Sequence, residues 1–394
     1  MMCLFPAVIS TALSQYDGIY PFNTAIDPRS AAMGESFVAL PSDPSALMYN
    51  PAGLAGLNGF TFSYSRMSMD WFAKDWSLAS VTAAAGTPYG VIAAQYNRMS
   101  MGTMAVTTVQ YPDGTGTEIS LYSYNLTLGY AYRLPVGLAL GVSAKYYDYQ
   151  QTVSGPAPDG LPPWHTVPSY LFDFGLTYTL PSLHSQSTVE DSVTVGMCYQ
   201  NIGSRWQVST QSNTFGSLGA TTTEYVVLPQ YFRLGLSYAM RLRPPEEGGL
   251  SPFGATITGE FRSLQSPLPT YYVPSTYSAP YPETSYWGVG LELTVYDILS
   301  VRGGAAFKPY SDVEADRDRA SFRYGACVRL PFRRIGVDLP LTFSFQYTVI
   351  PVSEPVTQYV FVQPAGPGFF EDTGVRTGTY PLFTLEVHYE GVPW

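Results

Sequence analysis

Apolar and polar residues alternate one for one along much of this chain. Between residues 122 and 134 every second residue is Tyr or Leu, and the residues between them are small or polar. The same pattern returns over residues 170–180, 232–241, 287–295, 322–332, 341–349 and 383–389. A period of two residues predicts β-strands that have one apolar face.

The length of these runs distinguishes two all-β architectures. Strands of soluble sandwiches average about 5 or 6 residues, whereas a strand that crosses a bilayer at a tilt needs about 9 to 11. Six of the seven runs here span 9 to 13 residues. A sandwich would also need short or charged edge strands, and the sequence offers none. The pattern therefore favours a membrane barrel.

The connections between the runs alternate between short turns and long loops, as in outer-membrane barrels. We predict a single antiparallel transmembrane β-barrel of about fourteen strands with both chain ends on the periplasmic side. The predicted strands begin near Gly59, Asp75, Tyr89, Glu118, Gly137, Ser169, Glu190, Leu228, Pro252, Thr284, Ile298, Arg319, Val337 and Thr379. Tyr130, Leu236, Phe343 and Leu385 should face lipid, and Thr127, Ser237, Ser344 and Glu386 the lumen.

The N-terminal part does not alternate and divides into two segments. Residues 1–14 are apolar and end in Ala12-Leu13-Ser14, which is typical of a signal peptide, complete or with its true start upstream. Residues 15–57 are predicted to form a hatch in the lumen, and residues 58–394 the barrel. We expect Asn50 to lie in an extended or turn conformation because Pro51 follows it.

Composition and charge narrow the function classes. Charged residues make up 13 % of the 394 residues, against about 25 % in soluble domains. The formal charge of −10 and the lack of Lys/Arg clusters argue against nucleic-acid binding. Cys3, Cys198 and Cys327 lie too far apart in sequence to indicate a disulfide framework. No catalytic triad or nucleophile elbow is recognisable, so we expect neither an enzyme nor a cofactor.

The inward face of the predicted strands carries charges and glycines. The expected lumenal charges are Lys145, Asp173, Arg233, Glu260, Arg262, Glu292, Arg302, Arg323, Arg329 and Glu386. A cation facing lipid at mid-bilayer would cost about 2 to 4 kcal/mol, so this placement supports the face assignment. The charges either hold the hatch or line a charged pore or headgroup site. Arg302, Arg329 and Glu386 are expected near Asp43 and Glu35 of the hatch.

Eight glycines share that inward face: Gly129, Gly141, Gly175, Gly196, Gly235, Gly290, Gly304 and Gly325. They either relieve crowding inside a closed sheet or leave room for a plug or ligand.

Acidic residues at every second position, Asp312, Glu314, Asp316 and Asp318, are the only candidate metal ligands, and Arg317 and Arg319 interrupt them. A calcium loop would also need a Gly and a terminal Glu that are missing here. We therefore predict no metal site and a solvated loop.

The segment from Ala31 to Leu54 resembles the N-terminal signature of FadL-type and PorV/PorQ-type outer-membrane barrels. The matching hatch positions are Gly34, Asp43, Asn50, Pro51 and Leu54. Further matches to the PorV/PorQ side are residues 200–203, 228–238, 288–292 and 299–304. The resemblance implies a location in the bacterial outer membrane.

Two functions follow from this resemblance. A PorV/PorQ-type protein would dock secreted or surface proteins through its long outer loops, in type IX-like secretion or outer-membrane assembly. A FadL-type protein would carry hydrophobic small molecules through its lumen. The expected partners are outer-membrane lipids and lipopolysaccharide, with either secreted proteins or a hydrophobic ligand. A passive porin is a third alternative, which a hatch would oppose.

Overall fold

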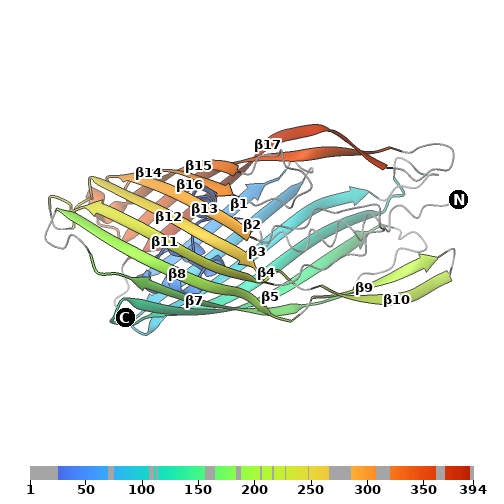
Figure 1. The fold of residues 1–394 in the computed structure, drawn as a ribbon, viewed down its shortest axis with the longest axis horizontal. Coiled ribbons are helices and arrows are strands. Elements are labelled where there is room, and N and C mark those ends of the chain that lie inside the picture. Colours follow the sequence, from blue (N-terminus) through green and yellow to red (C-terminus); the bar gives the residue numbers. More distant parts are fainter. Residues whose placement is uncertain are drawn as a thin grey trace.

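The computed structural model describes residues 25–69, 75–105, 111, 114–155, 165–182, 188–204, 206–214, 217–226, 228–246, 248–265, 285–307, 320–360 and 369–390. Within these ranges fourteen strands form one closed antiparallel barrel (Figure 1). Their bounds are β1 Phe60–Ser68, β2 Trp76–Thr87, β3 Gly90–Ala105, β4 Glu118–Arg133, β5 Leu138–Ser154, β7 Ser169–Thr179, β8 Val189–Gly203, β11 Tyr231–Leu242, β12 Phe253–Leu264, β13 Ser285–Val295, β14 Leu299–Phe307, β15 Ala320–Pro331, β16 Leu341–Val360 and β17 Phe369–Tyr389.

Successive barrel strands pair with each other, and β1 pairs with β17 to close the ring. This confirms the predicted fold class and strand number. The helical elements are short: α3 spans Pro28–Ala32, and the 3-10 turns are η1 Pro44–Met48, η2 Pro51–Gly56 and η3 Phe332–Ile335. No helix in the described ranges is long and apolar enough to cross a membrane.

Two parts of the strand prediction were wrong. Strands β6 (His165–Val167), β9 (Trp206–Thr214) and β10 (Ser217–Val226) form a separate sheet within predicted loops. β9 and β10 are rich in Ser, Thr and Gln and lack the apolar period of a membrane strand. In addition, β17 begins at Phe369 rather than near Thr379, because residues 369–378 pair with β16 but do not alternate.

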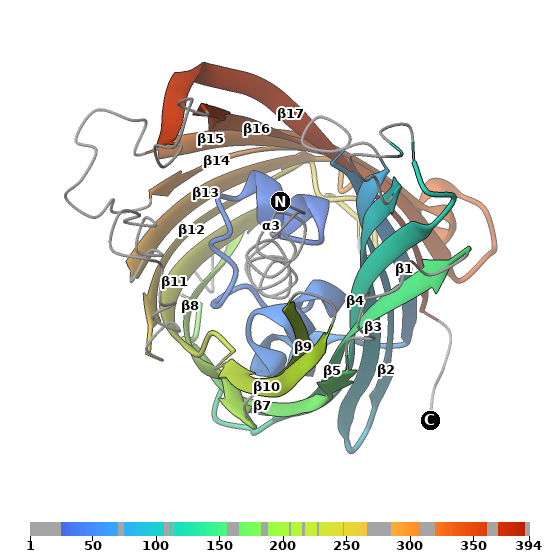
Figure 2. The same ribbon diagram turned by 90° about the vertical axis from the view of Figure 1, so that its right-hand side faces the viewer.

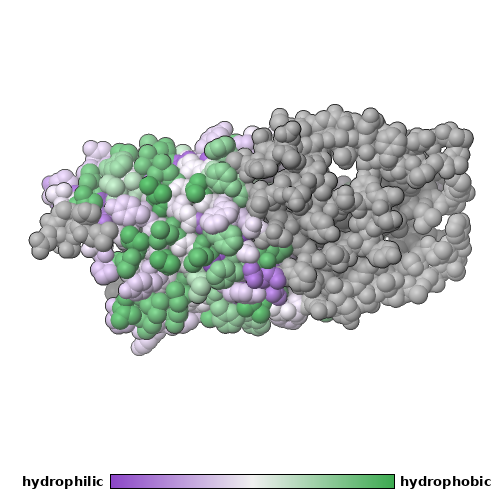
Figure 3. All heavy atoms as spheres, viewed as in Figure 1, coloured by the Kyte–Doolittle hydropathy of each residue, from purple (hydrophilic) through white to green (hydrophobic). Residues whose placement is uncertain are grey.

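The two faces of the wall differ as predicted. Tyr130 and Leu236 are 43 % and 53 % exposed on the outside, whereas Thr127 and Ser237 are only 2 % and 3 % exposed inside. Apolar side chains cover much of the outer surface of the strands (Figure 3). A closed sheet leaves no unpaired edge, and an apolar exterior suits hydrocarbon. The protein is thus a transmembrane barrel of the outer-membrane type.

The barrel has two distinct ends. Short connections, such as that between Thr87 and Gly90, lie at one end, which we call the turn end. The longer connections lie at the other, the loop end, where β9, β10 and the β16–β17 hairpin project (Figure 1). β1 begins and β17 ends at the turn end. In outer-membrane barrels the turn end faces the periplasm.

Candidate functional site

Residues 25–57, which we call the inner segment, lie within the barrel (Figure 2). Met33, Phe37, Leu47 and Leu54 of this segment are fully buried. Its η2 turn packs against β4, β5 and β7, and α3 packs against β14, β15 and β16. The predicted hatch residues 15–24 lie outside the described ranges, and the role of residues 15–57 as a plug stays a prediction.

Three Asx-Pro pairs shape the inner segment. Asp27, Asp43 and Asn50 each precede a proline, and each side chain accepts a hydrogen bond from a backbone N–H of the turn that follows. Proline suits the first position of a helical turn, and Asp or Asn is a favoured cap before it. Asn50 is extended, with φ −159° and ψ 103°, as predicted. It starts the last turn before β1.

All eight predicted inward glycines face the inner segment. A methyl group added at any of them would meet an atom of residues 32–52. Asn50, for example, lies against Gly175, and its Nδ2 donates to the Leu176 carbonyl at 3.1 Å. The room left by the missing side chains is therefore filled by the inner segment.

Gly34 makes the tightest approach from the inner segment's own side. Its φ of +64° favours glycine, and a Cβ there would lie 2.5 Å from the Ala305 carbonyl oxygen and 2.6 Å from that of Val289. The Tyr286 hydroxyl donates to the Gly34 carbonyl at 2.6 Å. This hatch-motif glycine thus lets the segment touch β13 and β14.

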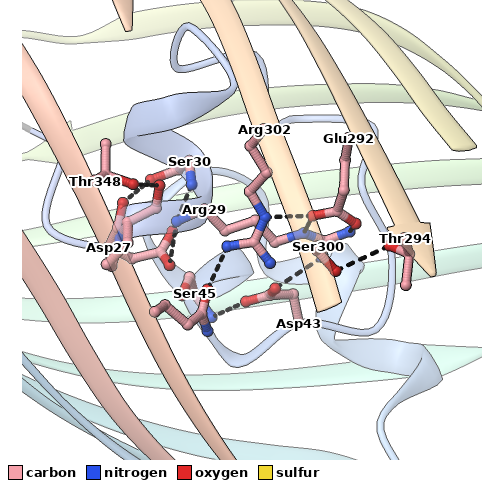
Figure 4. A network of polar contacts seen from close by, with 12 residues as sticks. Asp27, Arg29, Ser30, Asp43, Ser45, Glu292, Thr294, Ser300, Arg302 and Thr348 are labelled. Carbon is pink, nitrogen blue, oxygen red and sulfur yellow. Dashed lines mark hydrogen bonds and ion pairs between the residues drawn. The ribbon is translucent and has the colours of Figure 1, made fainter. Parts of the chain in front are cut away.

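Ion pairs hold the inner segment to one wall of the barrel (Figure 4). Arg29 bridges Asp43 at 2.9 Å and Glu292 at 3.0 Å, and Arg302 also bonds Glu292, at 2.5 Å. All four groups are largely buried. Buried charges of opposite sign that share hydrogen bonds fix a single geometry.

Two more charge clusters lie along the same wall. Glu35 accepts from Arg323 at 2.5 Å and lies 3.6 Å from Arg262. Glu260 accepts from Arg233 at 2.6 Å and from the backbone N–H groups of Phe37 at 2.8 Å and Val38 at 2.9 Å. Strands β11 to β15 thus bind the inner segment at several points.

The hatch carboxylates follow the expectation at one position only. Asp43 lines one cavity with Arg302, Arg329 and Glu386, as expected, and its ion pair is with Arg29 of its own segment. Glu35 instead binds Arg323 and Arg262. The path of the segment decides which strands its charges meet, and Arg29 was not included among the candidate site residues. Its position between two acidic residues of the same segment was the available signal.

The remaining predicted lumenal charges face inward but do not bind the inner segment through these clusters. Lys145 pairs with Asp173 at 2.7 Å, and Asp173 also accepts from Ser143 and from the backbone N–H of Asn201. This cluster braces the wall where the β7–β8 register shifts. At the turn end a cavity of about 330 Å³ has a polar lining that includes Arg29, Asp43, Arg302, Arg329, Glu386 and His388.

On the wall opposite the ion pairs, the inward side chains are apolar near the loop end and polar one row closer to the turn end. Near the loop end Leu382, Met67, Leu78, Met99, Ser123 and Tyr149 lie in register across β17 and β1 to β5. The five residues other than Ser123 form what we call the apolar row. They are buried in one cluster with Met101, Leu171 and Leu228, and with Ala31 of the inner segment.

The next inward row toward the turn end is polar. It consists of Thr384, Ser65, Ser80, Asn97, Asn125 and Tyr147. Asn97 Oδ1, Asn125 Oδ1 and Ser123 Oγ are buried and form no hydrogen bond in the described structure. Buried polar atoms normally have partners. These three atoms border the apolar row, so the place where they meet it is the candidate binding site.

Catalytic and metal chemistry is not recognisable in the described ranges. They contain no group of three His, Cys, Asp or Glu residues arranged to hold a metal. Asp312, Glu314, Asp316 and Asp318 lie outside those ranges. Cys198 and Cys327 are both free and buried, as expected for thiols on distant strands.

Comparisons with known proteins give structural likeness only. No protein-family model and no curated protein matches the sequence. Among solved structures, the chain is similar to the toluene transporter TodX of Pseudomonas putida, at 12 % identity and TM-score 0.48, covering 92 % of this chain and 97 % of that one. It is similar to a FadL homologue of Pseudomonas aeruginosa, at 13 % identity and TM-score 0.47, covering 93 % and 98 %. It is also similar to the monoaromatic hydrocarbon channel CymD, at 9 % identity and TM-score 0.45, covering 93 % and 98 %.

Proposed function

We propose that this protein is an outer-membrane channel for the uptake of hydrophobic small molecules. The observation that carries the proposal is the apolar row on the inner wall near the loop end. A water-filled porin has a polar interior, whereas these inward side chains are buried from water in one apolar cluster. A row of Met and Leu side chains facing the lumen therefore suits an apolar passenger.

The polar atoms beside the apolar row refine the expected ligand. Asn97, Asn125 and Ser123 are uncharged, and their free oxygens accept hydrogen bonds. An apolar molecule with one neutral donor group, such as a hydroxyl, would satisfy them while its body contacts Met67 and Met99. This activity would be of the same kind as that of TodX, and the proposal rests on this chain's own inner wall.

Binding of an uncharged aromatic probe tests the proposal. We would titrate the purified protein in detergent with N-phenyl-1-naphthylamine and follow its fluorescence. Met99→Gln should weaken binding by about tenfold, because desolvating the new amide costs roughly 1 to 3 kcal/mol. Met99→Leu keeps the apolar surface and volume and should bind as the unchanged protein does. Probe binding that Met99→Gln leaves unchanged would contradict the proposal.

A docking role in type IX-like secretion or outer-membrane assembly is the other function drawn from the sequence motifs. It depends on the long loops at the loop end, and much of these loops lies outside the described ranges. The probe titration separates the two functions, because a docking protein has no need of a lumenal ligand.

A further inference from the structure

Two arginines lie on the outer face of the barrel, where most side chains are apolar. In the register of β1, β2 and β3, Arg66 pairs with Ala79, and Ala79 pairs with Arg98. Both arginines are exposed, and neither forms an ion pair with a described carboxylate. Among the barrel-wall side chains described, every other Lys or Arg faces the lumen or lies at the turn end.

The spacing of the two arginines suits one shared anion. Two strand separations place their Cα atoms about 10 Å apart, and Ala79 between them has only a methyl group. An anion above Ala79 would therefore lie between the two arginine side chains. Arginine matches phosphate geometry through paired N–H donors.

Neighbouring groups complete this surface. The Arg98 guanidinium lies 4.7 Å from the Tyr122 ring centroid of β4, in a cation–π contact, so it would turn toward β2 to share an anion with Arg66. The next outward-facing residues toward the loop end are Ser77 and Ser100, which pair with each other across β2 and β3. Asp148 is the nearest outward-facing carboxylate on the described strands. Tyr124 lies between Asp148 and Arg98 in the strand register, and the Tyr124 hydroxyl donates to Asp148 at 3.3 Å.

The aromatic side chains indicate the depth of this surface in the membrane. Tyr64 and Tyr96 are the outward-facing residues two positions before Arg66 and Arg98 on the same strands. Tyr96, Tyr124, Tyr146 and Tyr170 continue as a chain of ring contacts across β3, β4, β5 and β7. Tyrosine belts mark the membrane interface. Arg66 and Arg98 therefore lie at headgroup depth on the loop-end side, in the outer leaflet.

We infer that Arg66 and Arg98 form a binding site for a phosphate-bearing lipid headgroup, namely a phosphate of lipid A in the outer leaflet. The phosphate sits over Ala79 between the two guanidinium groups, and its acyl chains lie along the apolar surface below. Ser77 and Ser100 contribute hydroxyl donors on the headgroup side. The site lies on the outer face and is independent of the lumenal site and of the proposed uptake.

Native mass spectrometry of the intact protein in detergent tests this site. The probes are bisphosphorylated lipid A, the same lipid after removal of both phosphates, and inorganic phosphate alone. Arg66→Ala/Arg98→Ala should lower lipid A affinity by about tenfold or more, because the phosphate loses both of its charged donors. The matched control, Arg243→Ala/Arg333→Ala, removes two exposed cations at the turn end and should bind lipid A unchanged.

Each outcome decides the question. Phosphate-dependent lipid A binding that only the Arg66/Arg98 variant loses supports the site. Equal binding of the dephosphorylated lipid, or an unchanged Arg66/Arg98 variant, overturns it. Inorganic phosphate that binds as well as lipid A overturns the lipid assignment. Heat-dependent migration on a denaturing gel shows that each variant is folded before it is compared.

Discussion

The two inner walls of the barrel contact the inner segment in different ways. Strands β11 to β15 hold it by directional ion pairs, from Arg29–Glu292 to the bonds that Glu260 accepts from Phe37 and Val38. Toward the loop end, β17 and β1 to β5 instead present Met, Leu and Tyr side chains. Directional contacts fix position, whereas apolar contacts are non-directional and adapt to different partners. One wall is thus suited to anchor the segment, and the other to receive a ligand.

The largest expected effect comes from removing the anchored element itself. Deleting residues 27–50 should raise single-channel conductance in planar bilayers severalfold, because a fourteen-strand barrel is wide enough to hold an aqueous channel once its interior is empty. The intact protein should conduct little. Large, steady conductance by the intact protein would contradict this and favour the porin alternative.

The charged wall can be tested at its most buried pair. Glu260→Gln should lower the free energy of unfolding in urea by about 3 to 5 kcal/mol, because Arg233 would keep a buried charge without its counterion. Glu190→Gln is the matched control. Its side chain is 54 % exposed beside Arg243, so the loss should stay below about 1 kcal/mol. Equal losses would mean that the charged wall does not anchor the segment.

The sequence predicts the wall better than the contacts inside it. Alternation fixes which face each strand residue occupies, so Lys145, Glu260 and Arg323 could all be assigned to the lumen. Partners depend on the path of residues 25–57 across the interior, and no local pattern encodes that path. The Arg29–Asp43 pair joins two turns of the inner segment and required the folded structure. The apolar row likewise appears only when the strand register brings Met67, Leu78 and Met99 side by side.

A smaller effect is expected where the segment touches the same wall through its backbone. Gly34→Ala should lower the free energy of unfolding by about 2 to 3 kcal/mol, combining the cost of a left-handed conformation with overpacking against Ala305 and Val289. Gly303→Ala on β14 is the control, since the nearest atom to an added methyl there is 4.0 Å away. Urea titrations of both variants check the difference. A Gly303→Ala loss as large as that of Gly34→Ala would show that close packing on the segment is not the cause.

The smallest effect should appear on the apolar wall and have the opposite sign. Ser123 Oγ is buried without a hydrogen bond, so Ser123→Ala should leave the free energy of unfolding unchanged or raise it by up to about 1 kcal/mol. Ser237 Oγ donates to the Ala39 carbonyl at 2.9 Å, and Ser237→Ala should lower the same quantity by about 1 kcal/mol. If Ser123 is kept for a ligand rather than for stability, Ser123→Ala should also weaken binding of 1-naphthol, which carries a hydroxyl, more than binding of naphthalene. A destabilised Ser123→Ala protein with unchanged naphthol binding would instead assign this hydroxyl to the fold.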